Sequence, residues 1–367
     1  MKSELTSLDL YYLVKEFQDL VGARIDKIYE QEEDKNEFLF IFHKSGVGKM
    51  MLRIKLPELA YLTDYKQTFP DTPPGYCMFL RKHLSGAKIK EIRQKGFERI
   101  LEIFFTTKDG IRILICELFS KGNMLLVDEE LKIRGLLKSQ NWQARIVRGG
   151  VKYEYPPEQT NTTSIGQEQF KDIISKSKMD SIVKTLAVDF GLGGFYAEEL
   201  CKRAKINKEK KRLDEKELGK LFNELKGLFN EEVKANKSGD ELVPFSLAAG
   251  AGKPYDSFNK LLDDVLTDKV VMQAQEKFVK EKQTKEDKTS LIIKKQEDRL
   301  KALEKSVKEN QRKGELIYEN YQEIKQLLDN INSDRKKMSW DELKKKYKNN
   351  KLLKEIDEKT GKIMVDL

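Results

Sequence analysis

A glycine-containing turn carries the pattern in this chain with the clearest chemical meaning. Gly191, Leu192 and Gly193 are followed by Ala197 and Leu200, the GhGxxxAxxh spacing of a helix-hairpin-helix motif, in which h is an apolar residue. Glycines allow such a hairpin to expose backbone N–H groups beside a helix N-terminus, and this geometry accepts a phosphate. We therefore predict a nucleic-acid backbone contact at Gly191 and Gly193. The competing interpretation is a tight turn with a purely structural role.

The residues that follow this turn are strongly basic. Lys202, Arg203 and Lys205 belong to the segment 202–212, in which Glu209 is the only acidic residue. Such a segment attracts phosphates without sequence specificity, so we expect these three side chains to contact an RNA backbone. A solvated basic helix face accounts for the same charges without a ligand.

A second group of cations begins at Arg81 and Lys82 and continues to residue 99. Arg81 and Lys82 end an expected helix, where the helix dipole favours positive charge. Charged residues in the strand that follows are typical of a solvent-facing surface. Taken alone, the group therefore needs no ligand, and His83 is interpreted as a capping or packing side chain.

No combination of residues suggests catalysis or metal binding. His43 and His83 are the only histidines, so neither a catalytic triad nor a metal-ligand cluster is indicated. The segment from Gly46 to Lys49 lacks the spacing and the following Ser or Thr of a phosphate-binding loop. The three cysteines are far apart and form no CxxC pair: Cys77, Cys116 and Cys201. We expect a protein that is not an enzyme, with no cofactor and no metal.

Composition limits the class of protein and its compartment. The chain has 367 residues, 39% of them hydrophobic, which is enough for two or three domains. A net charge of +9 favours polyanionic partners. The sequence shows neither a signal peptide nor a run of 18 apolar residues. A cytoplasmic protein without membrane contact is therefore expected.

The first 160 residues predict a β-rich domain with two helices. Helical spacing of apolar residues indicates a helix over 8–21 with Ser7 as N-cap, and Pro73 to Leu84 predicts a second helix. Alternating segments separated by turn residues predict antiparallel strands. These segments are 24–29, 37–43, 49–54, 89–95, 99–106, 111–119, 124–127 and 133–137.

The remaining residues predict helices. After a Pro- and Thr-rich boundary we expect a helix-hairpin-helix domain over 164–237, a bridge over 238–267 that packs back on the N-terminal domain, and a coiled-coil arm over 268–335. Apolar residues from Ile293 to Ile331 follow a heptad pattern, which requires another helix as partner. That partner is either a second chain or a returning helix of a longer protein. A small middle domain is expected over 338–367, at the tip of the arm.

The order of these segments resembles the NFACT family, also called NEMF in eukaryotes and RqcH in bacteria. The resemblance covers nearly the whole chain, and the lysine-rich composition looks archaeal. It rests on the motifs Ser7 to Leu10, Gly22 to Tyr29, Phe79 to Gly86, Gly96 to Arg99, Glu117 to Asn123, the hairpin at Gly191 and the bridge from Pro244 to Phe258.

The resemblance implies an α+β fold in which the first domain has the N-terminal fold of formamidopyrimidine-DNA glycosylases. A helix-hairpin-helix domain and a long coiled-coil arm follow, whereas the returning arm and a C-terminal RNA-binding domain of the family are missing from this sequence. Those glycosylases use an N-terminal proline, but this chain begins Met1–Lys2–Ser3. Glycosylase chemistry is therefore not expected.

The resemblance also implies a role in ribosome quality control. Family members bind a large ribosomal subunit that carries peptidyl-tRNA, contact rRNA, and recruit tRNA for template-free tailing of the nascent chain, with tRNA-Ala expected here. The family's tRNA-binding positions map to Asp9, Glu98 and Arg99, and we add Arg81 and Lys82. Many relatives have aspartate where this chain has Glu98. An internal ion pair is the structural alternative for these charged residues.

Three other functions fit parts of the sequence. A DNA-binding or repair protein fits the glycosylase-like fold, and a surface adhesin fits an old label of some bacterial relatives. A generic RNA-binding coiled-coil dimer fits the basic composition and the heptad pattern.

Overall fold

The computed structural model describes residues 4–31, 34–142, 145–157, 160–248, 254–358 and 360–367, with the backbone alone at 142, 269 and 273–288. The chain divides into two compact units, Met1–Ala274 and Gln275–Leu367. Each unit is described by itself.

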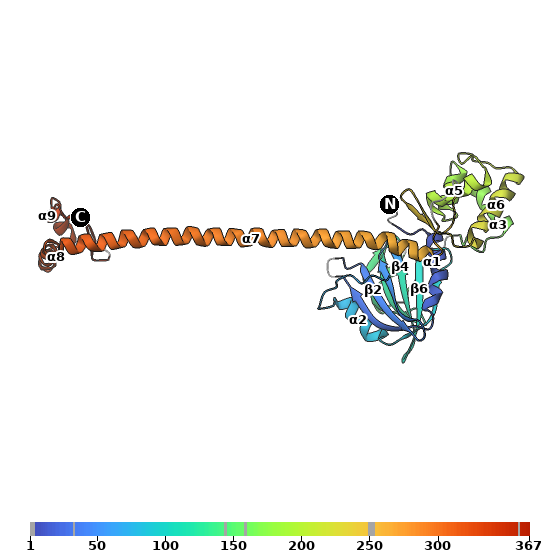
Figure 1. The fold of residues 1–367 in the computed structure, drawn as a ribbon, viewed down its shortest axis with the longest axis horizontal. Helices are drawn as coiled ribbons and strands as arrows, with labels where there is room; N and C mark the ends of the chain where they lie inside the picture. The colour runs from blue at the N-terminus through green and yellow to red at the C-terminus, as the bar shows by residue number, and fades with distance from the viewer. Residues whose placement is uncertain (1–3, 32–33, 143–144, 158–159, 249–253, 359) are drawn as a thin grey trace. The chain divides into compact units, whose positions relative to one another are not determined.

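A nine-stranded antiparallel sheet forms the centre of the first unit (Figure 1). Its order is β4-β3-β2-β1-β5-β6-β7-β8-β9, in which most neighbours are consecutive in the chain. The predicted antiparallel strands are thus confirmed, whereas β4 and the small β10–β11 pair were not predicted. The strands are β1 Arg24–Glu30, β2 Glu37–Lys44, β3 Gly48–Lys55, β4 Leu59–Leu62, β5 Lys88–Gln94, β6 Ile100–Thr107, β7 Gly110–Glu117, β8 Asn123–Asp128, β9 Ile133–Leu136, β10 Gln140–Trp142 and β11 Arg145–Val147.

Both faces of the sheet are covered around β8. Met124 and Leu126 belong to the main core, whereas Leu125 and Val127 belong to a second cluster on the other face. Every residue of β8 is therefore buried. Helix α2 (Gly75–Leu84) packs against this end of the sheet, and a Cβ at Gly135 would lie 2.2 Å from the ring of Phe79. Only glycine allows this close approach.

Helix α1 (Ser7–Phe17) begins one residue earlier than predicted. The N-cap is Thr6 and not Ser7, because the Thr6 hydroxyl accepts a hydrogen bond from the Asp9 N–H while the Asp9 carboxylate accepts one from the Thr6 N–H. This reciprocal capping box satisfies two backbone donors at the helix start. A short 3-10 turn, η1 (Gln18–Leu20), then ends the helical segment.

The helices after the sheet share its core. They are α3 Gln167–Lys176, α4 Ile182–Val188, α5 Gly193–Ala204 and α6 Glu215–Asn230. One continuous cluster contains Leu13 of α1, Ile103 of β6, Leu200 of α5 and Leu225 of α6. Tyr12 also donates to the Leu228 carbonyl at 2.6 Å. The predicted first and second domains are therefore joined by packed side chains rather than by a linker alone.

The long helix α7 (Phe258–Glu319) begins on the first unit, after a hairpin of β12 (Asn236–Ser238) and β13 (Glu241–Val243). The Glu16 carboxylate accepts hydrogen bonds from the backbone N–H groups of Phe258 at 2.7 Å and Asn259 at 2.8 Å. The Asn259 side chain bonds both backbone groups of Leu62 in β4. A negative charge at the first turn of a helix also complements its dipole.

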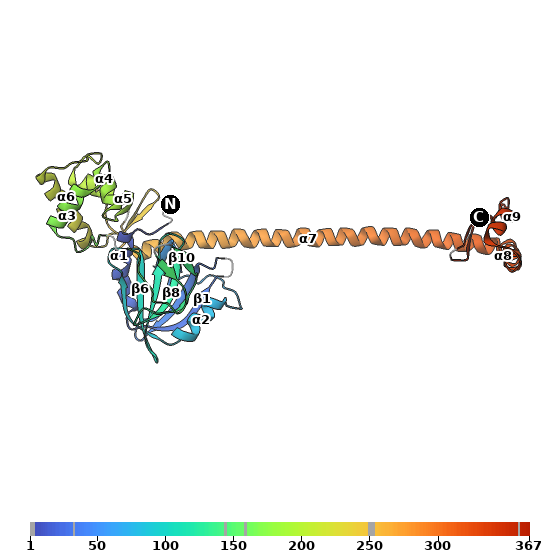
Figure 2. The ribbon, with the colours of Figure 1, turned by 180° about the vertical axis from the view of Figure 1, so that it is seen from behind.

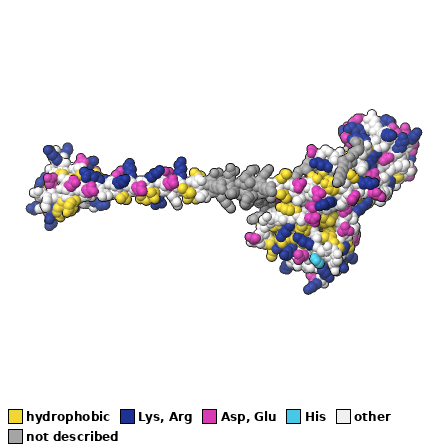
Figure 3. All heavy atoms as spheres, in the orientation of Figure 1, with side chains coloured by type: hydrophobic (Ala, Val, Ile, Leu, Met, Phe, Trp, Pro, Cys, Tyr) yellow, Lys and Arg dark blue, Asp and Glu magenta, His cyan; other side chains and the backbone are white. Residues whose placement is uncertain are grey.

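The second unit contains the rest of α7, followed by α8 (Tyr321–Arg335), α9 (Trp340–Tyr347), β14 (Leu353–Asp357) and β15 (Lys362–Val365). Figure 2 shows α7 as one uninterrupted helix. The heptad residues Leu300, Leu303 and Val307 are exposed, and Figure 3 shows apolar and charged side chains alternating along the described part of the helix. In the described ranges, every helix is too short or too polar to cross a bilayer.

Candidate nucleic-acid interface

Two of the predicted sites meet at one cavity of the first unit, with a volume of about 410 Å³. The N-terminus of α1 forms one wall and the turn between β5 and β6, with Glu98 and Arg99, forms another. The turn between α4 and α5, with Gly191 and Gly193, completes the cavity. The other lining residues are Glu4, Leu5, Thr6, Ser7, Phe119, Pro156, Pro157 and Ala187.

Arg99 is anchored but remains accessible. Its Nη1 group donates to Glu4 Oε2 at 3.0 Å and to the Leu5 carbonyl at 3.2 Å. The side chain is 28% exposed and that of Glu4 is 54% exposed. An ion pair this open to water contributes little to stability. Arg99 can therefore exchange Glu4 for a phosphate or a base edge at small cost.

The backbone around Glu98 is held by contacts with two neighbouring segments. The Gln94 amide donates to the Ser7 carbonyl at 2.9 Å and to the Glu98 carbonyl at 2.8 Å. The Leu118 N–H donates to the Arg99 carbonyl at 2.8 Å. These bonds fix the half-buried Glu98 and Arg99 relative to the start of α1.

Asp9 is placed behind the cavity and not in it. Its side chain is fully buried, and it accepts hydrogen bonds from the Thr6 N–H at 2.7 Å, the Thr6 hydroxyl at 2.8 Å and the Tyr196 hydroxyl at 2.6 Å. Tyr196 belongs to α5. In this structure Asp9 thus positions the N-terminus of α1 against the helix that follows the glycine turn.

The glycine turn has the backbone conformation that its sequence predicts. Gly191 and Gly193 have φ angles of +66° and +75°, a region that side-chain-bearing residues rarely adopt. A Cβ at Gly193 would also lie 3.7 Å from the Thr6 methyl group. The N-cap position of α5, Leu192, gives no side-chain cap. The first N–H groups of α5 can therefore bind an anion.

The basic residues after the turn lie at the other end of α5. Lys202 follows Gly193 by nine residues, which corresponds to about 13 Å along a helix. Arg203 is bound by the carboxylates of Glu199 and Glu231 and donates to the Ser246 carbonyl at 2.7 Å. Lys205 adopts the left-handed conformation that ends α5. The structure therefore separates these three cations from the glycine turn.

Arg81 and Lys82 are also remote from Glu98 and Arg99. Arg81 lines a different cavity, and its Nε donates to the Ile28 carbonyl at 2.7 Å. Lys82 is exposed in the last turn of α2. The neighbouring His83 ring lies 4.5 Å from the Phe79 ring, which confirms its packing role.

Several residues in the cavity wall or bonded to it were not identified from the sequence. Glu4 and Gln94 carried no motif, and Pro156–Pro157 was interpreted only as a domain boundary. Phe119 belongs to a motif used for the family resemblance, but its spacing did not indicate a site. In the described part of the chain, no group of His, Cys, Asp and Glu side chains is arranged to hold a metal ion.

Sequence comparisons relate this chain to an archaeal and a yeast protein. The Archaeal Rqc2 homolog aRqcH of Methanocaldococcus jannaschii is 36% identical across 100% of this chain and 58% of its own length. The Ribosome quality control complex subunit 2 of Saccharomyces cerevisiae is 36% identical over 37% of this chain and 13% of its own length. The chain thus spans little more than half of its archaeal relative.

A solved structure supports the fold. The N-terminal part of the fibronectin/fibrinogen-binding protein of Streptococcus suis matches 72% of this chain and 100% of its own, with a TM-score of 0.60 and 26% identity. The family model described as NFACT N-terminal and middle domains matches residues 6–366. This chain belongs to the NFACT family.

Proposed function

We propose that this chain is part of a ribosome quality control factor that recognises tRNA at the cavity between Glu98, Arg99 and the α4–α5 turn. The factor binds large ribosomal subunits that carry peptidyl-tRNA and recruits tRNA, with tRNA-Ala as the expected species, for template-free C-terminal tailing. Peptide transfer is performed by the ribosome, so the factor itself is not an enzyme. Its place of action is the cytoplasm.

The observation that carries this proposal is that three features suited to RNA binding line one cavity. Arg99 offers a planar cation for a phosphate or base edge, and the half-buried Glu98 offers a carboxylate that accepts from base amino groups. The first turn of α5 offers backbone N–H groups to a phosphate. The names of the archaeal and yeast relatives support the ribosomal context.

Three finer structural interpretations belong to this proposal. The first domain has the glycosylase-like fold, α4 and α5 form a helix-hairpin-helix, and α7 is one helix of a coiled coil. The exposed stripe of Leu300, Leu303 and Val307 supports the last interpretation. Its partner is a second copy or a helix of a longer chain. Light scattering of the 367-residue chain distinguishes these partners, because only the first produces a dimer.

To test the proposal, the affinity for deacylated tRNA-Ala and for competing tRNAs is measured at two salt concentrations. The unmodified chain is compared with a variant that combines Glu98→Ala and Arg99→Ala. Each well-formed contact to a base edge contributes about 1–3 kcal/mol of discrimination. We therefore expect the variant to bind tRNA-Ala at least about tenfold more weakly and to lose most of its preference over other tRNAs.

A matched control removes the exposed Asp172–Lys176 ion pair of α3, which likewise deletes one acid and one cation. Its affinity should equal that of the unmodified chain. Equal binding by all three proteins, with a steep salt dependence and no tRNA preference, would reduce the site to general electrostatic attraction.

A further inference from the structure

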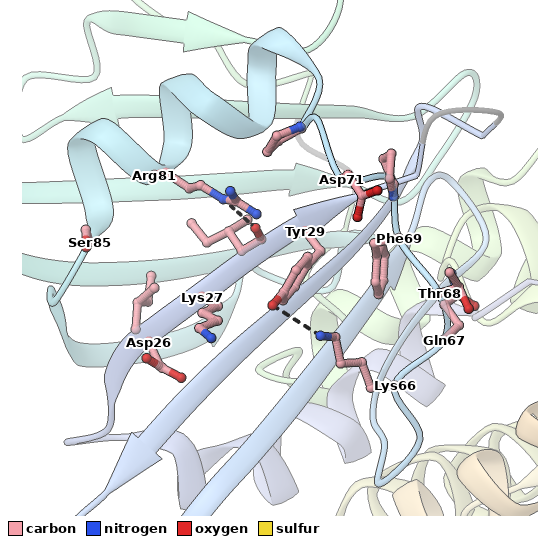
Figure 4. A pocket seen from close by; sticks show the side chains of 14 residues that line it. Asp26, Lys27, Tyr29, Lys66, Gln67, Thr68, Phe69, Asp71, Arg81 and Ser85 are labelled. Atoms are coloured by element: carbon pink, nitrogen blue, oxygen red, sulfur yellow. Dashed lines mark hydrogen bonds between the residues drawn. The ribbon is translucent and has the colours of Figure 1, made fainter.

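A second cavity, with a volume of about 620 Å³, lies on the first unit between β1, the segment 66–73 and α2 (Figure 4). Its lining residues differ from those of the cavity at Glu98 and Arg99. The cavity combines an aromatic pair, three cations, two carboxylates and backbone groups. This mixture differs from a general anion-binding surface and matches the chemistry of a nucleotide.

An aromatic pair forms one wall of the cavity. The rings of Tyr29 and Phe69 are stacked with centroids 5.0 Å apart and an interplanar angle of 28°. Both residues are half-buried and pack on the small cluster of Leu39, Ile41 and Met51. Their position is therefore fixed by packing while part of each side chain remains accessible. Such a platform stacks unpaired bases of any sequence.

Two of the cations are held next to this platform. The Lys66 Nζ lies 4.2 Å from the Tyr29 ring centroid and donates to the Tyr29 hydroxyl at 3.1 Å. The Arg81 Cζ lies 5.4 Å from the same centroid, and its Nε is bound by the Ile28 carbonyl at 2.7 Å. Figure 4 shows Lys66 and Arg81 on either side of Tyr29. A phosphate next to a stacked base would thus meet positive charge.

Two carboxylates narrow the choice of ligand. Asp26 and Asp71 line the same cavity as Lys27, Lys66 and Arg81, so the local excess is a single positive charge. The ionised side chains of an acidic peptide are acceptors only and offer these two carboxylates no hydrogen-bond donor. A nucleotide uses them, because its base amino groups and ribose 2′-hydroxyl donate hydrogen bonds to such acceptors.

We propose that this cavity binds one unpaired nucleotide of a single-stranded RNA segment. The base lies against Tyr29 and Phe69, and Lys66 and Arg81 contact the adjoining phosphates. This inference goes beyond the proposed function, since it concerns a separate surface and holds for RNA of any origin.

The test uses the 367-residue chain and a seven-nucleotide RNA with 2-aminopurine at its centre. Fluorescence quenching reports stacking and anisotropy reports affinity. Tyr29→Leu keeps an apolar side chain but removes the ring, and we expect about tenfold weaker binding with loss of quenching. Lys66→Ala removes one phosphate contact at an exposed position, so we expect about threefold weaker binding.

The controls separate this cavity from general charge effects. Lys49→Ala removes an exposed lysine of β3 outside the cavity and should leave binding unchanged. Lys66→Arg should retain most of the affinity. Adenosine monophosphate should compete much more weakly than the RNA, because it offers a single phosphate.

Four results would overturn the inference. The first is an equal loss of affinity in the Lys49 and Lys66 variants. The second is unchanged quenching in Tyr29→Leu, provided that circular dichroism shows the variant to be folded. The third is displacement of the RNA by hexaglutamate as readily as by unlabelled RNA. The fourth is competition by free adenosine monophosphate as effective as by the RNA, which would make the cavity a free-nucleotide site.

Discussion

Buried hydrogen bonds between residues distant in sequence fix the segments that border the cavity of Glu98 and Arg99, where we propose that tRNA binds. Asp9 and Tyr196 are 187 residues apart, and their side chains bond at 2.6 Å with no exposed surface. The contact joins the start of α1 to α5, and both helix ends border the cavity of Glu98 and Arg99. A substitution behind the cavity should therefore alter binding without touching RNA.

Tyr196→Phe tests this coupling. Burial, together with the charge of Asp9 and its hydrogen bond, raises the pKa of Tyr196 well above its usual 10.0, so the hydroxyl remains a donor at neutral pH. Removing it leaves a buried carboxylate oxygen without this donor, which costs about 1–3 kcal/mol. We expect a lower free energy of unfolding in urea and weaker tRNA binding. Tyr318→Phe, at a residue 83% exposed, should change neither quantity; equal effects of the two substitutions would disprove the coupling.

The three cysteines should be inert in the folded protein. All are buried, and burial raises the pKa of Cys201 from its usual 9.0 to about 11. Burial also raises the pKa values of Cys77 and Cys116. Since the thiolate is the reactive form, modification by Ellman's reagent at pH 8 should be slow until denaturant is added. Rapid reaction of the native chain would contradict this burial.

The same shift predicts a pH dependence of stability. A thiol whose pKa is higher in the folded state than in the unfolded state stabilises the fold as long as it is protonated in both states. The contribution of Cys201 is complete below its unfolded pKa near 9 and is lost as the pH rises towards about 11. Cys201→Ala should therefore have a shallower decline of the free energy of unfolding between pH 9 and 11. An identical decline in both proteins would exclude this contribution.

At the scale of elements, local patterns predicted most of the first domain. Strands β1 to β3 and β5 to β9 follow from alternating residues and turn signals, because each has neighbours close in sequence. Strand β4 has only four residues, too few for an alternating pattern of apolar and polar residues to predict it. Thr6 was missed as N-cap because its partner, Asp9, was interpreted as a binding residue rather than as part of a capping box.

The α4–α5 turn allows an experiment with an adjacent control. Gly193 has a φ of +75°, whereas Gly194 has no positive φ, and a Cβ at Gly193 would make only an ordinary contact with the Thr6 methyl group, at 3.7 Å. Gly193→Ala should cost about 1–2 kcal/mol, the usual penalty for a left-handed conformation, and should weaken tRNA binding. Gly194→Ala should be neutral or slightly stabilising, because alanine favours helix formation. Equal melting temperatures for the two variants would exclude a conformational requirement at Gly193.

At the scale of the whole molecule, the sequence could not show which distant segments meet. Glu98 and Arg99 are more than ninety residues from Gly191 and Gly193, yet they line one cavity. Lys202 to Lys205 are near the glycine turn in sequence but lie one helix length away. Tertiary packing decides which of these residues line the cavity and which lie far from it. Charge and spacing along the chain indicate only which residues are close in sequence.

The division into two units predicts that the first unit folds alone. A fragment of residues 1–274 keeps the shared core and the capping contacts of Glu16 with the start of α7. It should unfold in one transition within a few degrees of the first unit in the intact chain, and it should keep the tRNA preference. Calorimetry and tRNA titration of the fragment test both points; loss of the preference would place recognition in residues 275–367.

The most direct test of the account compares the dissociation constants for tRNA-Ala and a competing tRNA in the unmodified chain and in Arg99→Lys. Lysine keeps the charge but lacks the planar fork that makes two parallel hydrogen bonds. If Arg99 recognises tRNA through the planar shape of its guanidinium group, the preference for tRNA-Ala falls about tenfold in Arg99→Lys while the salt dependence of binding stays the same. An unchanged preference would contradict tRNA recognition by Arg99.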